Sequence, residues 1–341
     1  MAAVWDSILR TQLIERRHRL QEAIRASDET AHLVSLLQQV DSTLERIDTA
    51  SYGLCDGCHE PIEKERLMAD PLVRTCLGCL TAEQQHALEQ DLDLASRIQG
   101  GLLPKSRDFD GWKICFHYQP AGPVSGDYCD LVEDEKRAGG LFFLLGDVSG
   151  KGVAASLLMA HLHAIFRSLI AMGLPVHQLV QQANRVFCGS TLSTHYATLV
   201  CGRASAGGEI ELCNAGHCPP LVIRKGEVSS VDATGLPIGI FCTGHYSVKK
   251  LHLSPGDTLL LYTDGVSEAQ DGTQAEYGLE RLLRLAGAHH DWPPQALIDG
   301  CLEDLSAFRR GTPYRDDLTL MVLRRAALLS GQIPDNVVGL G

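Results

Sequence analysis

The chain has 341 residues, 45% of them hydrophobic, and a formal net charge of −12. This length and composition can fill more than one folded core, and the acidic balance excludes a broadly basic surface of the kind that binds nucleic acids. No uninterrupted apolar run reaches the roughly 18 residues that span a membrane, and the N-terminus lacks the apolar stretch of a signal peptide. We therefore expect a cytoplasmic protein with no membrane contact and no direct contact with nucleic acid.

Two helical patterns fill the first fifty residues. Residues 3–26 repeat apolar side chains at helical spacing, and residues 31–48 repeat them every four and three positions, as in a coiled-coil seam. Between the two patterns, Ser27 or Asp28 is a candidate N-cap for the second helix. The sequence predicts an antiparallel helical hairpin over residues 1–50.

Four of the twelve cysteines form two close pairs. Cys55 and Cys58 make the first pair, Cys76 and Cys79 make the second, and seventeen residues lie between the pairs. This spacing is typical of zinc ribbons, in which four thiolates hold one structural Zn²⁺. The other eight cysteines lie singly, which favours a reducing compartment over a disulfide framework. We therefore expect a C4 zinc finger over residues 51–82.

A further amphipathic helix is predicted over residues 81–100. Its apolar face carries Leu88, Leu92, Ala95 and Ile98. Gly100, Gly101 and Pro104 should end this helix. We expect a linker helix within residues 83–104, whose apolar stripe either packs against a partner, such as a second copy of the chain, or belongs to a passive spacer.

The following region, residues 105–328, alternates strand-like runs with turns. The runs share apolar side chains, and they are residues 113–120, 140–149, 196–205, 210–217, 220–226, 257–264 and 318–325. Longer helical patterns cover residues 153–172, 175–187 and 294–309. Turns at 205–208 and 224–227 predict hairpins between antiparallel neighbours. The expected fold is α+β: two mostly antiparallel sheets face to face with helices outside, and then a flexible tail at 329–341.

Four short acidic segments stand out in this domain. They read SGDYCD, GDVSGKG, YTDGVSEA and RDDLTLMVL, and their first aspartates are Asp127, Asp147, Asp264 and Asp316. Each segment places an aspartate at the end of a strand-like run or in the turn just after one. A carboxylate buried there is costly unless it is paired or binds a metal. Four such segments indicate oxygen ligands that converge on hard divalent cations.

A family resemblance rests on eight stretches between Asp93 and Arg325, among them YQPAGPVSGDYCDLV, LFFLLGDVSGKGVAASLLMA, CNAGHCPPLVI and LSPGDTLLLYTDGVSEAQ. In order and content they resemble the RsbU/SpoIIE-type serine/threonine phosphatases, which have the metal-dependent type 2C fold. The resemblance implies two Mn²⁺ or Mg²⁺ ions bridged by Asp147, with the backbone carbonyl of Val148 completing the first site. It further implies that Asp264 and Asp316 hold the second metal.

The same resemblance places Asp127 at the metals directly or through water, and it makes Asp130 and Asp317 second-rank candidates. Asp316 and Asp317 are adjacent, so both cannot point inward along one extended segment. We expect Asp317 to support the loop. No side-chain nucleophile is required, because water activated by two metals attacks the phosphorus.

Residues around these aspartates allow two further expectations. Gly150 and Gly152 should permit the sharp turn from strand to helix after Asp147. Lys151 faces either the substrate phosphate or solvent, and His217 either contacts the site or holds a turn.

The cysteine-rich segment reads RIDTASYGLCDGCHEPIEKERLMADPLVRTCLGCL. It resembles the zinc finger of the DksA/TraR family, whose members carry a hairpin and a finger and bind RNA polymerase. The resemblance implies that the four cysteines hold one structural Zn²⁺. Two roles stay open for the module, because it either positions or dimerises the phosphatase or contacts RNA polymerase.

The resemblances together imply a phosphatase that hydrolyses phosphoserine or phosphothreonine on a regulatory protein. By resemblance that protein is an anti-sigma-factor antagonist, and the zinc module regulates the enzyme. The alternative is a scaffold or RNA-polymerase-binding regulator with little or no catalysis. The complete set of aspartates favours the enzyme, since a scaffold has no reason to keep every ligand.

Overall fold

The computed structural model of the protein describes residues 2–26, 30–134, 140–191 and 195–326. It divides the chain into two compact units, Met1–Asp91 and Leu92–Gly341. The expected flexible tail at 329–341 lies outside the described residues. So do Ser27 and Asp28, and the N-cap position of the second helix belongs to Thr30, whose side chain makes no capping hydrogen bond.

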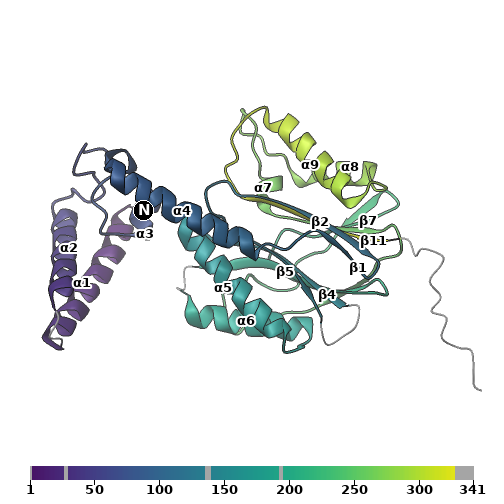
Figure 1. The fold of residues 1–341 in the computed structure, drawn as a ribbon, viewed down its shortest axis with the longest axis horizontal. Helices are drawn as coiled ribbons and strands as arrows, with labels where there is room; N and C mark the ends of the chain where they lie inside the picture. Colours follow the sequence, from purple (N-terminus) through teal and green to yellow (C-terminus); the bar gives the residue numbers. More distant parts are fainter. Residues whose placement is uncertain (1, 27–29, 135–139, 192–194, 327–341) are drawn as a thin grey trace, which may run out of the picture. The chain divides into compact units, whose positions relative to one another are not determined.

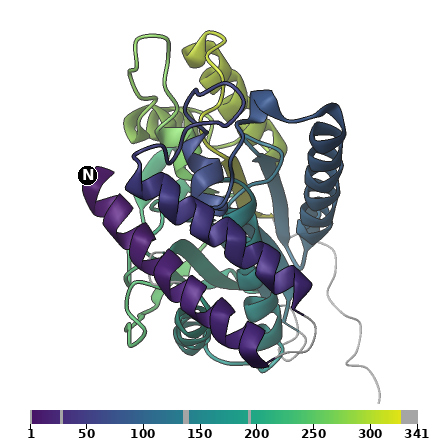
Figure 2. The ribbon, with the colours of Figure 1, turned by 90° about the vertical axis from the view of Figure 1, so that its left-hand side faces the viewer.

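The first unit begins with helices α1 (Ala2–Ala26) and α2 (Ala31–Asp48), which lie side by side (Figure 2). Ion pairs join Arg10 to Asp48 at 3.1 Å and Arg17 to Asp41 at 3.8 Å. The later arginine of α1 pairs with the earlier aspartate of α2, so the two helices are antiparallel. Their shared core contains Leu9, Leu13, Leu20, Val40 and Leu44. The helical hairpin expected from the sequence is confirmed.

The cysteine-rich segment follows with little regular structure. It contains the short helix α3 (Lys64–Ala69) and the 3₁₀ turn η1 (Leu77–Cys79). Its own small core consists of Cys55, Ile62 and Cys76. A segment with so few apolar side chains needs another source of stability, such as a structural metal.

Helix α4 (Ala82–Leu102) contains the boundary between the two units and runs past the expected end. Gly100 and Gly101 lie inside this helix, contrary to the prediction that they end it. A side chain added at either glycine would meet nothing within 4 Å, so neither glycine serves a close contact. The helix ends only shortly before Pro104, as the restricted backbone before proline requires.

The second unit contains two sheets whose paired strands are antiparallel (Figure 1). The six-stranded sheet has the order β1 (Arg107–Phe109), β2 (Trp112–Gln119), β11 (Leu318–Arg325), β10 (Thr258–Tyr262), β7 (Leu221–Arg224) and β8 (Glu227–Ser230). The five-stranded sheet has the order β3 (Asp127–Glu133), β4 (Gly140–Val148), β5 (Ala197–Ser205), β6 (Glu209–Ala215) and β9 (Lys249–His252).

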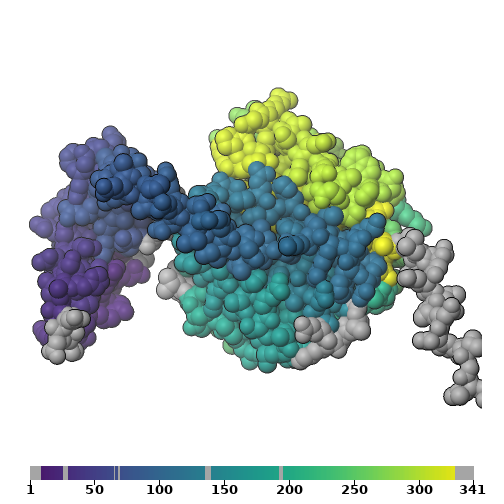
Figure 3. All heavy atoms as spheres, viewed as in Figure 1, coloured from purple at the N-terminus to yellow at the C-terminus, as the bar shows by residue number. Residues whose placement is uncertain are grey.

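The sheets face each other across an apolar core, and helices cover both outer faces. Leu145 of β4 and Met321 of β11 belong to the core between the sheets. Helices α5 (Gly152–Ile170) and α6 (Val176–Ser190) pack on the five-stranded sheet, whereas α8 (Leu279–Ala288) and α9 (Pro294–Arg309) pack on the six-stranded sheet. In Figure 3 these helix pairs form the teal and yellow-green layers. The expected sandwich is confirmed.

Several elements were not expected from the sequence. Strands β1, β8 and β9 are only three or four residues long, and helix α8 has ten residues. Strand β3 begins at Asp127 and β11 begins at Leu318, shortly after Asp316, so these two aspartates stand at strand starts and not at the expected strand ends. The hairpins predicted at 205–208 and 224–227 are present, since β5 pairs with β6 and β7 pairs with β8.

Helix α5 has the length and hydropathy of a membrane span, contrary to the expectation that no segment does. Its Met159, Leu162 and Phe166 are buried against the five-stranded sheet. The core helix of a packed sandwich passes the same test of length and composition, so α5 is only weak support for a membrane contact.

Candidate metal centre

Strand alternation explains why three polar side chains meet at one end of the sandwich. Successive side chains of a strand point to opposite faces, and the core between the sheets takes Cys129 of β3, Leu145 of β4 and Met321 of β11. Counting two residues along each strand puts Asp127, Asp147 and Thr319 on the same inner face. The antiparallel register pairs Asp127 with Asp147 directly.

The carboxylate of Asp127 is buried and held by two hydroxyl groups. Thr263 Oγ1 and Thr319 Oγ1 donate to its Oδ2 at 3.1 and 2.5 Å. No hydrogen bond reaches Oδ1 from the part of the chain that the structure describes. Burial is the main cause that raises the pKa of Asp127 well above its usual range, and repulsion from Asp147 is the second. The two hydroxyl groups therefore fix the orientation of the Asp127 carboxylate and leave its Oδ1 available to a ligand.

Three further carboxylates form an uncompensated negative cluster. Burial raises the pKa of Asp147 to about 8, and the charges of Asp264 and Asp316 add to this effect. Burial and Asp316 likewise raise the pKa of Asp264. The cation closest at hand is Lys151, whose Nζ lies 2.8 Å from Asp316 Oδ2 and donates to the backbone carbonyl of Arg315 at 2.6 Å. One lysine cannot neutralise this cluster.

Two glycines allow the segments of the site to approach each other. A side chain on Gly126 would lie 3.0 Å from the Val148 carbonyl oxygen and 3.2 Å from Asp147 Oδ1, so these two oxygens sit on the same side of the glycine. A side chain on Gly265 would collide with the Asp317 carbonyl at 1.9 Å. The second contact brings the turn after β10, which carries Asp264, against the segment before β11.

The two second-rank aspartates have other tasks. Asp317 accepts hydrogen bonds from the backbone N–H groups of Ala121 at 2.8 Å and Gly126 at 2.9 Å, so it fastens two loops together. Asp130 lies on the outer face of β3, where Arg167 of α5 binds both carboxylate oxygens at 2.7 and 2.6 Å. The structure brings neither carboxylate into the cluster as a free ligand.

Other residues of the site were missed or left open. In the sequence, the only indication that the hydroxyls of Thr263 and Thr319 belong to the site is that these residues lie close to Asp264 and Asp317. His217 is buried between the sheets: its Nδ1 lies 2.8 Å from Thr198 Oγ1 of β5. Burial lowers its pKa to about 4, and the backbone carbonyl of Tyr262 on β10 opposes this shift. The side chain of Asn214 holds the turn: the His217 backbone N–H donates to its Oδ1 at 2.8 Å, whereas the buried Nε2 of His217 has no hydrogen-bond partner among the described residues.

The donor set fits divalent cations. Carboxylates and a backbone carbonyl are the oxygen ligands that Mg²⁺ and Mn²⁺ prefer. Among the described residues, only the four cysteines place three or more ligand atoms within 4.8 Å of one another. The carboxylate oxygens are spaced more widely, which leaves room for the water ligands that such ions keep. Gly150 and Gly152, with φ of 101° and 70°, supply the expected turn after Asp147.

The first unit holds the second candidate metal site. The sulfur atoms of Cys55, Cys58, Cys76 and Cys79 all lie within 4.8 Å of one another, which fits one tetrahedral Zn²⁺. Backbone N–H groups, that of Cys76 first, lower the pKa of Cys55 to about 6. Metal binding needs the thiolate, so this thiol is prepared for it.

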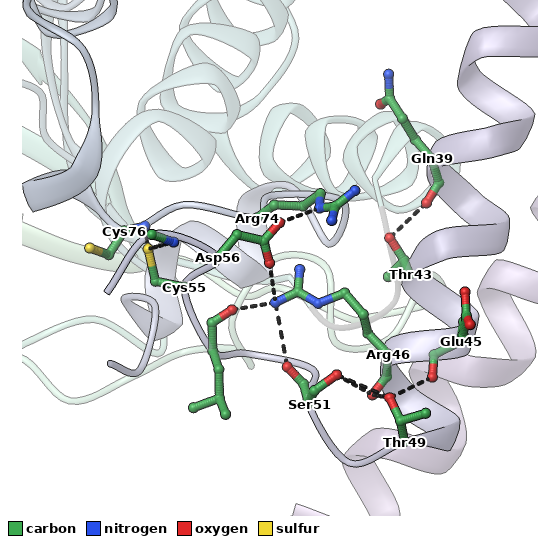
Figure 4. A network of polar contacts seen from close by, with 12 residues as sticks. Gln39, Thr43, Glu45, Arg46, Thr49, Ser51, Cys55, Asp56, Arg74 and Cys76 are labelled. Carbon is green, nitrogen blue, oxygen red and sulfur yellow. Dashed lines mark hydrogen bonds and ion pairs between the residues drawn. The ribbon is translucent and has the colours of Figure 1, made fainter. Parts of the chain in front are cut away.

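An ion-pair network ties this site to the hairpin (Figure 4). Asp56, next to Cys55, lies 2.7 Å from Arg74 Nε and 3.4 Å from an Nη2 of Arg46 on α2. Arg46 also donates to the backbone carbonyls of Ser51 and Leu54. The Arg46 side chain is largely buried, so the network fixes the start of the finger against the end of α2.

The fold of the second unit is that of PP2C phosphatases. The SiaA-PP2C domain of Pseudomonas aeruginosa superposes with a TM-score of 0.63 at 22% identity, and the match covers 72% of this chain and 98% of that one. Residues 137–326, more than half of the chain, match the family model of stage II sporulation protein E (SpoIIE). The chain belongs to the SpoIIE family, as its motifs predicted. Residues 50–85 match the prokaryotic DksA/TraR C4-type zinc finger.

Two curated relatives match most of the second unit. Phosphoserine phosphatase RsbU of Bacillus subtilis is 27% identical over 274 residues, which cover 75% of this chain and 78% of RsbU. Protein IcfG of Synechocystis is 26% identical over 267 residues, 69% of this chain. The chain spans only 41% of the length of IcfG.

Proposed function

We propose that the chain is a metal-dependent protein serine/threonine phosphatase. The observation that carries this proposal is the cluster of Asp147, Asp264 and Asp316, in which burial and mutual repulsion raise the pKa of Asp147 to about 8. Such a cluster is unfavourable without cations and becomes favourable with them. Membership of the SpoIIE family and similarity to a phosphoserine phosphatase support the same activity.

Asp147 and the Val148 carbonyl would hold the first metal, with Asp147 shared between both. Asp264 and Asp316 would hold the second, and Asp127 would contribute its free Oδ1 directly or through water. When bound, two Mn²⁺ or Mg²⁺ ions would neutralise the charge of a phosphoryl group, and they would also lower the pKa of a water molecule so that it becomes a nucleophile at neutral pH.

The remaining residues of the site orient this set. Thr263 and Thr319 hold Asp127 by one oxygen, and Asp317 fixes the loop that carries Gly126. Lys151, hydrogen-bonded to Asp316, places a positive charge where an incoming phosphate meets the cluster. These groups do not react; they keep ligand oxygens in place before substrate arrives.

The proposed substrate is a phosphoserine or phosphothreonine on a cytoplasmic regulatory protein of the anti-sigma-factor-antagonist kind. Similarity to RsbU, a phosphoserine phosphatase, supports phosphoserine as the phosphorylated residue. Release of inorganic phosphate from phosphoserine, phosphothreonine and phosphotyrosine peptides with Mn²⁺ tests it. We expect the parent to hydrolyse the phosphoserine and phosphothreonine peptides and the Asp264→Asn variant to hydrolyse neither. Hydrolysis that survives this substitution would contradict the proposal.

We further propose that residues 1–82 form a zinc-stabilised module that regulates or docks the phosphatase, and that the linker helix supports a homodimer. Leu94 and Ile98 of α4, exposed by 50% and 60%, support the second point. An RNA polymerase contact is a second candidate function, favoured by the DksA/TraR finger match. Co-elution of the full chain with RNA polymerase, lost in Cys55→Ser, would establish that contact, and its absence would retire it.

A further inference from the structure

A pocket of about 160 Å³ adjoins the carboxylate cluster. Asp316 forms one side of it, and the rest of the wall includes Arg309, Tyr314, Arg315, Glu268 and Gln270. All of these residues belong to the second unit. A phosphoserine bound at the cluster would therefore have its neighbouring residues at the mouth of this pocket.

Arg309 at the end of α9 is a buried cation without a counter-charge. The residue is 8% exposed, and its guanidinium lies 3.3 Å from the centroid of the Tyr314 ring. Its hydrogen bond goes to the backbone carbonyl of Thr312. No carboxylate pairs with it in the part of the chain that the structure describes. A buried charge is costly unless it is paired, so Arg309 indicates an anion supplied from outside.

A second guanidinium stands at the rim of the same pocket. Arg315 is exposed, and its Nη1 donates to the neutral amide oxygen of Gln270 at 2.8 Å. Glu268 also lines the pocket but pairs with neither arginine, and Asp316 already has Lys151 as its partner. The lining thus holds two arginines, neither of which is paired with a carboxylate among the described residues.

We propose that this pocket binds an anionic side chain of the substrate protein, close in sequence to the phosphorylated serine. Arginine is suited to this task, because its planar fork matches carboxylate and phosphoryl oxygens. The anion is either the carboxylate of an aspartate or glutamate or a second phosphorylated serine. The proposal rests on the proposed phosphatase function and adds a substrate preference to it.

The test uses phosphoserine peptides of equal length in which both neighbours of the phosphoserine are Glu, Ala or Lys, and a fourth peptide with a second phosphoserine. Both kcat/KM and the dissociation constant are measured for the full chain with Mn²⁺. We expect the Glu peptide to exceed the Lys peptide about tenfold, an effect in the range of one charge-assisted contact at a partly exposed site. The doubly phosphorylated peptide identifies which anion fits better.

Charge reversal at the rim provides the decisive comparison. In Arg315→Glu the ratio of the Glu to the Lys peptide should fall to about one or invert, since a carboxylate now repels the anion. Lys249→Glu, an exposed lysine on β9, is the matched control and should keep the parental ratio. Arg309→Gln should lower the ratio in the same way, and a melting curve checks that this variant is folded.

Equal values for the Glu, Ala and Lys peptides in the parent would overturn the proposal. So would a preference that Arg315→Glu leaves unchanged. A parent that hydrolyses no aryl phosphate with Mn²⁺ would count against the phosphatase function itself, and the dissociation constants would still decide whether the pocket selects anions.

Discussion

At the scale of single residues, Asp147 carries a conflict between stability and function. Its pKa is about 8 in the folded chain against 3.8 for an unperturbed aspartate. The folded state therefore binds this proton more tightly, and the stabilisation that protonation gives is present below pH 4 and lost as the pH rises through 8. At pH 8.5 without metal, the ionised carboxylate destabilises the fold.

The first prediction concerns Asp147→Asn. This variant should melt higher than the parent in metal-free buffer at pH 8.5, by roughly 2 to 4 °C, because it removes a buried negative charge. It should also lose most of the stabilisation that Mn²⁺ gives the parent. Melting curves at pH 5 and 8.5, with and without Mn²⁺, check both points. A variant that melts lower than the parent at pH 8.5 would contradict this account.

The second prediction concerns the hydroxyl group of Thr319, which donates to Asp127 at 2.5 Å. Thr319→Val keeps the shape of the side chain but leaves Asp127 less firmly held. We expect the Mn²⁺ concentration at half-maximal activity to rise about fivefold to tenfold, as the loss of a hydrogen bond to a charged group implies. Thr258→Val, at the start of the neighbouring strand β10, is the control. Equal metal dependence in both variants would show that Thr319 has no positioning role.

At the scale of elements, strand alternation decides which aspartates can serve the site. Asp127 and Asp130 lie on the same strand but on opposite faces, and Asp130 is fully buried against Arg167 of α5. The third prediction is that Asp130→Asn lowers the free energy of unfolding by about 1–3 kcal/mol while metal affinity stays as in the parent. Chemical denaturation and Mn²⁺ titration measure the two quantities. A large loss of metal affinity in a folded variant would show that the ion pair positions the site.

The sequence predicted the elements that are long and periodic. Strand β4 and helix α9 could be bounded within a residue or two, because each has a continuous pattern. Short strands such as β8 and β9 carry too few residues for any pattern, and the glycines of α4 suggested an end where tertiary context permits a continuous helix.

The aspartates of the site could be proposed from motifs, yet their geometry could not. Asp127 opens β3, whereas Asp147 stands near the end of β4. Only the antiparallel register shows that a strand start and a strand end meet, as it does for Asp127 and Asp147. The partner of Asp130 is Arg167, which lies 37 residues away, and a contact between residues so far apart leaves no local signal in the sequence.

At the scale of the whole molecule, the two units have different sources of stability. The second unit has a large apolar core, whereas the finger has a small core and four thiols. The fourth prediction is that Cys76→Ser lowers the melting temperature of the first unit and leaves that of the second unchanged, since zinc binding supplies the folding free energy of the finger. Calorimetry of the zinc-loaded parent and variant checks this, and two unchanged transitions would contradict it.

The most direct measurement is Mn²⁺-dependent hydrolysis of an aryl phosphate by the parent, Asp147→Asn and Asp264→Asn, together with calorimetric Mn²⁺ binding. The phosphatase account predicts turnover that requires Mn²⁺ in the parent and a loss of at least a hundredfold in both variants, as for removal of a group that acts on the reacting centre. Metal binding should weaken in parallel. A parent that binds no Mn²⁺ and releases no phosphate would contradict the account and leave the scaffold alternative.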